Sequence, residues 1–174
     1  MTKKEIDTIM DNANTRETKS FLDIQPKEIS KFQAFLAIKP ILKGKLYWYA
    51  LRRGYTETDN LYDYRNDIKD AFLSETPSKE YLMIKEEQKH LKSLQAKLTI
   101  YRLMTEDEFE SKKFGVSWTL KEEIAKNLND KQSFVNPDTF EMKKIIHRIN
   151  IKKADVMAFI NHRKEFEIIY VHKL

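Results

Sequence analysis

Residues 161–174 read NHRKEFEIIYVHKL, a polar and charged segment that runs into an apolar stretch typical of a β-strand. Two glutamates, Glu165 and Glu167, flank Phe166 at the point where the apolar stretch begins. Because side chains alternate between the two faces of a strand, we expect both carboxylates to point to the same face. Two like charges held side by side repel each other, so this placement calls for a physical reason.

The bulk composition fits one domain, or one domain with a helical extension. The chain has 174 residues, of which 41% are hydrophobic and 34% are charged, so it can bury a modest core. It contains no cysteine, which excludes disulfides and thiolate metal sites. No apolar run is long enough to span a bilayer, and residues 1–20 have no signal-peptide core. We therefore expect a soluble cytoplasmic protein with no membrane partner.

Charge, glycine content and motifs argue against several common classes of binding site and enzyme. The net charge of +5 indicates an anionic partner only weakly, because lysines are mixed with acidic residues throughout the chain. With three glycines, the sequence has neither a GxGxxG nor a GxxxxGK[ST] loop, which argues against a dinucleotide fold or P-loop of the usual kind. The four histidines lack metal-ligand spacing, so no metal site is predicted. No GxSxG motif supports acyl transfer.

Hydrophobic periodicity divides the chain into a helical N-terminal region, residues 1–95, and a β-rich region, residues 96–174. In the first region we expect Gly54 to end a helix and Ser78 to cap another. The segments with apolar residues at helical spacing are 26–38, which begins at Pro26, and 41–55, 60–75 and 78–94.

The second region alternates between strands and short helices. Thr105 with Glu108, and Thr119 with Glu122, form two predicted capping boxes. Residues 154–160 are predicted to form a turn or a short helix. The expected strands are 97–104, 114–119, 143–151 and 165–171, with a loop around Pro137 at 134–140. These elements predict an α+β fold in which the helical region packs on a β-sheet.

Two further pieces precede the glutamates in a fixed order along the chain. Tyr101-Arg102 lies in the first expected strand, and Ser117-Trp118-Thr119 ends the next. With the Glu-x-Glu segment, this order over residues 97–174 resembles the mono-ADP-ribosyltransferases of the Arg–Ser–Glu class, in their small phage and bacterial form. The resemblance implies an ADP-ribosyltransferase-like core with a split, mixed β-sheet, and NAD+ as co-substrate.

The resemblance also implies which residues bind NAD+. Arg102, beside Tyr101, is expected to bind its phosphate or ribose, since a guanidinium can donate two parallel hydrogen bonds to phosphate oxygens. Ser117 and Thr119 are expected to shape the nicotinamide pocket, with Ser117 orienting the catalytic glutamate. Many relatives have glycine after the Tyr-Arg pair, where this chain has Leu103, which changes how closely a phosphate can approach the backbone.

The two glutamates receive the catalytic roles. Cleavage of the nicotinamide–ribose bond builds positive charge on the ribose, and a nearby carboxylate stabilises that charge. The resemblance assigns this role to Glu167. It assigns to Glu165 the orientation or deprotonation of an arginine guanidinium on a target protein. The expected target is a host protein in a bacterial cytoplasm, with the chain acting as a toxin-like phage or bacterial effector.

Other interpretations stay open at this point. Arg102 could be a structural ion-pair partner, Thr119 a helix cap, and the glutamates a solvated strand start. A non-catalytic protein of the same fold could bind a host protein or, less favoured, nucleic acid. Its surface would be LYWYALRRGY, residues 46–55, where aromatic residues accompany Arg52 and Arg53. An NAD glycohydrolase would use the same site with water as acceptor.

Overall fold

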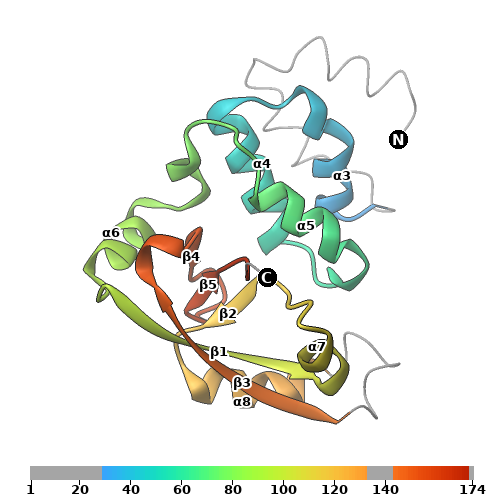
Figure 1. Cartoon of the computed structure of the whole chain (residues 1–174). Helices are drawn as coiled ribbons and strands as arrows, with labels where there is room; N and C mark the ends of the chain where they lie inside the picture. The colour runs from blue at the N-terminus through green and yellow to red at the C-terminus, as the bar shows by residue number, and fades with distance from the viewer. Residues whose placement is uncertain (1–28, 133–142, 173–174) are drawn as a thin grey trace. The chain divides into compact units, whose positions relative to one another are not determined.

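The computed structural model describes residues 29–132 and 143–172. Within these residues the chain forms six α-helices and a five-stranded sheet, which confirms the α+β class (Figure 1). The helix start expected at Pro26 and the loop expected at 134–140 lie outside the described residues. Within the described part of the chain, no helix has the length and apolar character needed to cross a membrane.

The described chain divides into two compact units. One comprises residues 29–61 with Leu73–Leu82, and the other comprises Tyr62–Phe72 with the described residues from Met83 onward. The change from helices to strands falls at β1 (Lys97–Thr105), close to the predicted boundary at residue 95. The units divide earlier, so α5 (Arg65–Phe72) and α6 (Lys85–Ser93) belong to the unit that contains the sheet.

The first unit is built on α3 (Lys31–Ile38) and α4 (Gly44–Thr56), with the 3-10 helices η1 (Lys39–Ile41) and η3 (Lys79–Leu82). Ser30 caps α3 in a reciprocal capping box with Gln33. The buried hydrophobic residues of this unit include Phe32, Phe35, Ile38, Tyr47, Trp48 and Leu51. The aromatic members pack edge to face or tilted, which is the preferred geometry of such rings.

Two sequence predictions for this region are wrong. Gly54 does not end α4, which continues to Thr56; a Cβ at Gly54 would lie 3.2 Å from the Phe32 Cα, so the glycine permits close approach of α3. Ser78 does not cap a helix over 78–94, because its φ is +69° whereas a helix N-cap needs extended backbone. The 3-10 helix η3 follows it, and α6 begins only at Lys85.

The segment LYWYALRRGY forms most of α4, and three of its four aromatic residues, Tyr47, Trp48 and Tyr55, are buried. Tyr47 and Trp48 are 3% and 0% exposed, so they do not present an aromatic surface. Arg52 donates to the Leu82 carbonyl at 3.0 Å, and Arg53 pairs with Glu57 at 2.9 Å. The side chains proposed as the surface of a binding protein therefore contact other residues of their own unit instead.

The Arg53–Glu57 pair gives a pH-dependent prediction. The hydrogen bond from Arg53, reinforced by Lys31, lowers the pKa of Glu57 to about 2. A depressed pKa stabilises the fold above the unfolded-state value of 4.5, and this stabilisation is lost as the pH falls toward 2. We expect Glu57→Gln to lower the free energy of unfolding by about 1 kcal/mol at neutral pH, because the pair is partly solvated. Urea denaturation at several pH values should show the difference vanishing in acid; a constant difference would contradict the assignment.

The sheet has the strand order β3-β1-β2-β5-β4. The remaining strands are β2 (Ser117–Thr119), β3 (Lys144–Lys152), β4 (Ala158–Ile160) and β5 (Glu167–Ile169). All four neighbouring pairs are antiparallel, so the prediction of a mixed sheet is wrong for the described strands. The segments containing α7 (Glu106–Ser111) and residues 161–166 each return the chain at the end of the sheet where it left, which produces antiparallel neighbours. The turn or short helix expected over 154–160 is present only at its start, as the 3-10 helix η5 (Lys153–Asp155), and strand β4 forms the rest of that segment.

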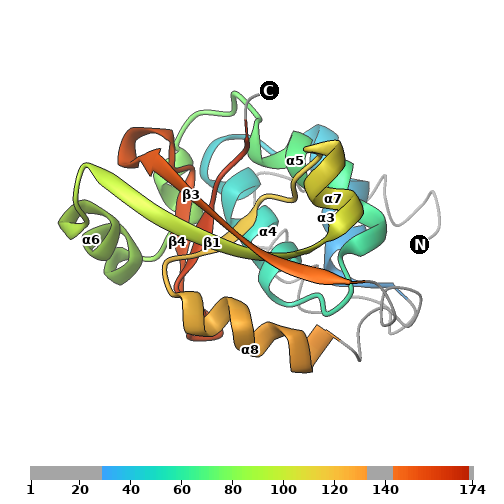
Figure 2. The same cartoon turned by 60° about the horizontal axis from the view of Figure 1, so that its bottom comes forward.

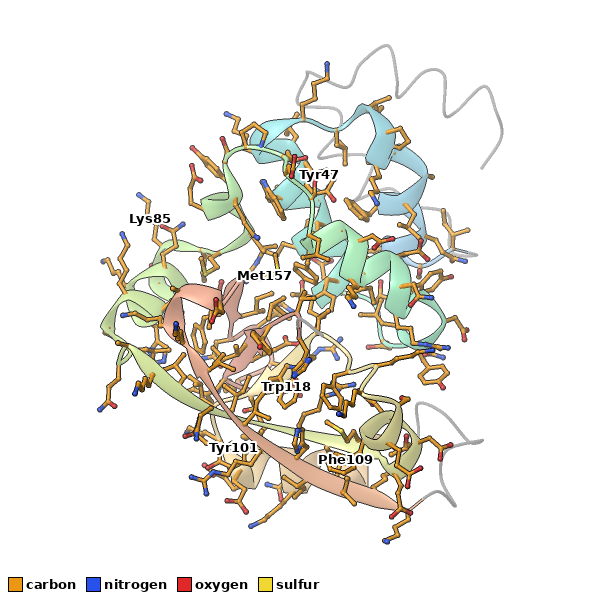
Figure 3. The ribbon with its side chains drawn as sticks, viewed as in Figure 1. Tyr47, Lys85, Tyr101, Phe109, Trp118 and Met157 are labelled. Atoms are coloured by element: carbon orange, nitrogen blue, oxygen red, sulfur yellow. The ribbon has the colours of Figure 1, made fainter. Side chains whose placement is uncertain are left out.

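The two faces of the sheet differ in chemistry. One, the core face, carries the buried cluster of Leu98, Ile100, Met104, Trp118, Ile151, Phe159 and Ile168. The other, the α8 face, is covered in part by α8 (Glu122–Gln132), which runs along one side of the sheet in Figure 2. Tyr101 and Trp118, both labelled in Figure 3, belong to opposite faces. The face on which a side chain lies decides whether it joins the core or the site.

Candidate functional site

A small open pocket of about 130 Å³ lies on the α8 face of the sheet. It brings together residues from β1, β2, the start of α8 and the segment before β5. All six residues predicted from the sequence line this pocket: Tyr101, Arg102, Ser117, Thr119, Glu165 and Glu167. The remaining lining residues are Leu103, Trp118, Ile124 and Ala125. The pocket is therefore apolar on its helical side and acidic where β5 begins.

Ser117 orients the carboxylate of Glu167. The Ser117 hydroxyl donates to Glu167 Oε1 at 2.5 Å, within the range of short charge-assisted O–H···O bonds. Strands β2 and β5 pair with Thr119 opposite Glu167, which places these three side chains on one face. The carboxylate is thus fixed by a neighbouring strand rather than left to rotate in solvent.

Thr119 ties β2 to the segment that carries Glu165. Its hydroxyl donates to the Glu165 carbonyl at 2.7 Å and accepts the Lys121 N–H at 3.2 Å. Because α8 begins at Glu122, the capping box predicted between Thr119 and Glu122 does not form. Thr119 therefore contributes to the site through its hydroxyl, which holds the main chain beside the pocket.

Glu165 and Glu167 share the pocket for a different reason from the one the sequence indicated. Strand β5 begins at Glu167, so Glu165 is not in the strand, and the alternation argument fails. Phe166 between them has φ +49°, a left-handed conformation that costs a bulky L-residue about 1–2 kcal/mol. Both glutamates nevertheless line the pocket. The left-handed Phe166, rather than strand periodicity, brings the two carboxylates together.

Arg102 lies on the core face. Strand β1 pairs with β3 without interruption, and Arg102 is opposite His147, whose ring centroid lies 6.0 Å from that of Trp118. Cross-strand neighbours share a face, so the Arg102 side chain extends away from the face of Ser117, Thr119 and Glu167. Arg102 is nevertheless among the residues that line the pocket, beside Ser117 and Thr119 of β2.

The Arg102 guanidinium is held by three hydrogen bonds. Its Nε and Nη2 donate to Glu108 at 2.8 and 3.3 Å, and its Nη1 donates to the Ser117 carbonyl at 2.7 Å. Glu108 also accepts the Gly115 N–H at 2.8 Å. A Cβ at Gly115 would lie 2.4 Å from Arg102 Nη2, so only glycine admits the guanidinium there. Arg102 thus fixes the backbone of Ser117, which in turn orients Glu167.

This arrangement predicts that the main effect of Arg102→Lys is on the stability of the fold rather than on the binding of NAD+. Lysine cannot make the forked contact with Glu108 and also reach the Ser117 carbonyl, so we expect a loss of about 1–3 kcal/mol in unfolding free energy. Urea denaturation of Arg102→Lys, Glu108→Gln and the double variant tests this. Because the two side chains act as a pair, the double variant should cost less than the sum of the single variants. Additive losses would contradict the pairing, and a raised KM for NAD+ with unchanged stability would instead indicate a phosphate-binding role.

The sequence interpretation missed Glu108 and Gly115 as parts of the site. Glu108 was assigned to a capping box, and Thr105 does accept its N–H at 3.2 Å, but the Glu108 carboxylate turns to Arg102 instead. Gly115 is one of three glycines in the chain, and that scarcity was the available signal. Trp118, between Ser117 and Thr119, is a core residue with 2% of its surface exposed.

His147 lies beside Trp118 on the core face, and both His147 and His172 pack against the ring of Phe114. Burial, together with the neighbouring His172, lowers the pKa of His147. Among the described residues, no group of three or more His, Cys, Asp or Glu side chains is arranged to hold a metal ion.

No protein-family model, curated protein or solved structure was found to match this chain. The resemblance to ADP-ribosyltransferases that the sequence motifs indicate therefore stays a prediction.

Proposed function

We propose that the protein is an NAD+-dependent mono-ADP-ribosyltransferase that modifies a guanidinium group of a target protein. The observation that carries this proposal is the Ser117–Glu167 hydrogen bond of 2.5 Å, in a pocket that Glu165 also lines. A fixed carboxylate beside a second carboxylate suits a reaction with two cationic centres. One centre is the ribose as its bond to nicotinamide breaks, and the other is the acceptor.

NAD+ would supply the nicotinamide–ribose bond, whose cleavage leaves positive charge on the ribose. Glu167 would lie against that charge, and its hydrogen bond from Ser117 keeps the carboxylate in place before the reaction begins. Such preorganised charge stabilises the transition state more than the ground state. The nicotinamide nitrogen would leave with the bonding electron pair.

Glu165 would act on the acceptor. A guanidinium is protonated at neutral pH, so a nitrogen that attacks the ribose carbon has to lose a proton. The carboxylate of Glu165 can orient the cation and accept that proton. The Thr119 hydroxyl donates to the main-chain carbonyl of Glu165, so the backbone from which this side chain extends is held beside the pocket.

The described residues fit NAD+ in part. The pocket volume of about 130 Å³ is close to that of a cavity of about 150 Å³ that accommodates benzene, so it suits the nicotinamide ring alone. The pyrophosphate would lie outside it and needs a cation on the α8 face, where Arg102 does not point. Arg148 is the exposed cross-strand neighbour of Tyr101 on that face, and we propose it for this contact.

Two activities have to be measured separately to test the proposal. One is the release of nicotinamide by the wild-type protein, and the other is the transfer of label from tagged NAD+ to proteins in a bacterial lysate. Both are expected from a transferase. Nicotinamide release without labelling would indicate an NAD glycohydrolase, and neither activity, in lysates shown to contain candidate targets, would favour the binding protein. The transferase is favoured over the binding protein because α4 buries the aromatic residues that such a surface would need.

A further inference from the structure

Helix α6 carries a buried carboxylate, that of Glu87, which has no part in the proposed reaction. Glu87, on α6, is 4% exposed. Its Oε2 accepts the Ile84 N–H at 3.0 Å, and its Oε1 accepts the Asn161 N–H at 2.8 Å. Burying a carboxylate is unfavourable unless such donors satisfy it, so its position needs a structural reason. The second bond links α6 to the residue that follows β4.

Asn161 passes this restraint on to the segment between β4 and β5. Its side-chain Oδ1 accepts the Phe166 N–H at 3.1 Å, and its main-chain carbonyl accepts the Lys164 N–H at 3.2 Å. The main-chain and side-chain oxygens of Asn161 thus both accept hydrogen bonds from within residues 161–166 and hold this segment in a turn. We call residues 161–166 the carboxylate turn, since Glu165 lies within it and Glu167 follows it directly.

Residues outside the carboxylate turn also contact Phe166, whose backbone is in the left-handed conformation. The Phe166 carbonyl accepts the Leu120 N–H at 3.1 Å. Lys121 Nζ lies 3.7 Å from the centre of the Phe166 ring, and His90 of α6 lies 6.3 Å from it, centroid to centroid. A strained backbone conformation persists only where the surroundings over-determine it, and such residues gather at functional sites. Each of these contacts fixes the reversal between Glu165 and Glu167.

We propose that Glu87 is a positioning residue for the two carboxylates. Through Asn161 it anchors the carboxylate turn to α6 and holds the conformation in which Glu165 and Glu167 face one pocket. The inference that this affects a reaction rests on the proposed function. The anchoring itself rests on the two hydrogen bonds that join Glu87 to Asn161 and Asn161 to Phe166.

The test compares Glu87→Gln with Glu86→Gln. Glu86 is the exposed neighbour on the same helix and serves as the matched control. Glutamine has one carbonyl oxygen and an NH2 group, so it cannot accept both N–H groups that bond to Glu87. A second variant, Asn161→Ala, removes the acceptor for Phe166 while keeping the backbone N–H that donates to Glu87.

Amide hydrogen exchange provides a readout that does not need activity. In Glu87→Gln and Asn161→Ala we expect the Phe166 amide to exchange about tenfold faster or more, while the buried Ile100 amide of β1 is unchanged. The turnover number for nicotinamide release should fall about tenfold, with the KM for NAD+ within about twofold. Glu86→Gln should change neither quantity.

The outcomes separate this inference from the proposed function. Unchanged exchange at Phe166 in a folded Glu87→Gln would overturn the inference whatever the activity and whatever Asn161→Ala shows. Faster exchange with an unchanged turnover number would show that the anchoring has no part in the reaction. Faster exchange in a protein whose wild type releases no nicotinamide would leave the anchoring standing and refute the proposed reaction. Should Glu87→Gln fail to fold, Asn161→Ala decides by the same two measurements.

Discussion

Glu167→Gln is expected to lower the rate of nicotinamide release by about 10³-fold. A carboxylate about 4 Å from a developing positive charge contributes about 4 kcal/mol at an effective dielectric constant of about 20, and each 1.36 kcal/mol is a factor of ten in rate. Glutamine has the same shape and can still accept the Ser117 hydroxyl hydrogen, so the site should keep its geometry. The loss should therefore appear in the turnover number rather than in stability.

The control for this variant is Glu110→Gln, an exposed glutamate on α7 that does not line the pocket. Chromatographic measurement of nicotinamide, with thermal unfolding of each variant, separates a chemical effect from a folding effect. We expect Ser117→Ala to lower the rate by about tenfold, because the carboxylate remains but loses the bond that orients it. Nicotinamide release by Glu167→Gln at the wild-type rate would remove Glu167 from the reaction and, with it, the basis for the proposed enzyme.

The sequence identified the residues of the pocket more reliably than it explained their arrangement. Glu165 and Glu167 do line one pocket, but the predicted reason, strand alternation, does not apply, since β5 begins only at Glu167. The actual reason is the positive φ of Phe166. A bulky aromatic residue gives no local signal for that conformation, which glycine or asparagine would have indicated. It depends on contacts from α6 and from Leu120 and Lys121, which are distant in sequence.

The orientation of Arg102, in contrast, was available from the sequence. Alternation along β1 places Arg102 with Ile100 and Met104, which are apolar, and not with Tyr101. The pairing with Glu108 was hidden because Glu108 also fits a capping box with Thr105. Family resemblance and strand periodicity gave different answers for this side chain. The structure agrees with periodicity on the face that Arg102 occupies, and its contact with NAD+ stays a prediction.

The sequence predicts four of the five strands, and it predicts the bounds of the long strands best. Strands β1 and β3 are nine residues each and have a clear alternation that the sequence shows. Strands β2, β4 and β5 have three residues each; the sequence predicts longer strands for β2 and β5, over 114–119 and 165–171, and no strand for β4. Strand β4, Ala-Phe-Ile, is buried on both faces and lies in a segment that the sequence predicts as a turn or short helix. Such short strands are defined by their neighbours in the sheet.

Glu165→Gln is expected to separate the two halves of the reaction. Transfer of ADP-ribose to a guanidinium acceptor should fall about 10²-fold, the usual contribution of a positioned general base, because an amide cannot accept the proton. Nicotinamide release should stay within about threefold of the wild-type rate, since Glu167 and its bond from Ser117 are untouched. The turn should persist as well, because Thr119 binds the main-chain carbonyl of Glu165 and not its side chain. Tagged NAD+ with a small soluble guanidino compound as acceptor measures transfer, and nicotinamide measures cleavage.

The ratio of transfer to cleavage identifies the acceptor chemistry. If Glu165 serves the acceptor, the ratio falls in Glu165→Gln, is unchanged in Glu110→Gln, and is unchanged in Glu167→Gln, where both activities fall together. A wild type that cleaves NAD+ without labelling the guanidino compound, and whose rate Glu165→Gln does not alter, uses water as acceptor. A parallel loss of transfer and cleavage in Glu165→Gln would place Glu165 in bond cleavage itself, contrary to its assigned role. The two carboxylates of one pocket are thereby distinguished by which bond each one controls.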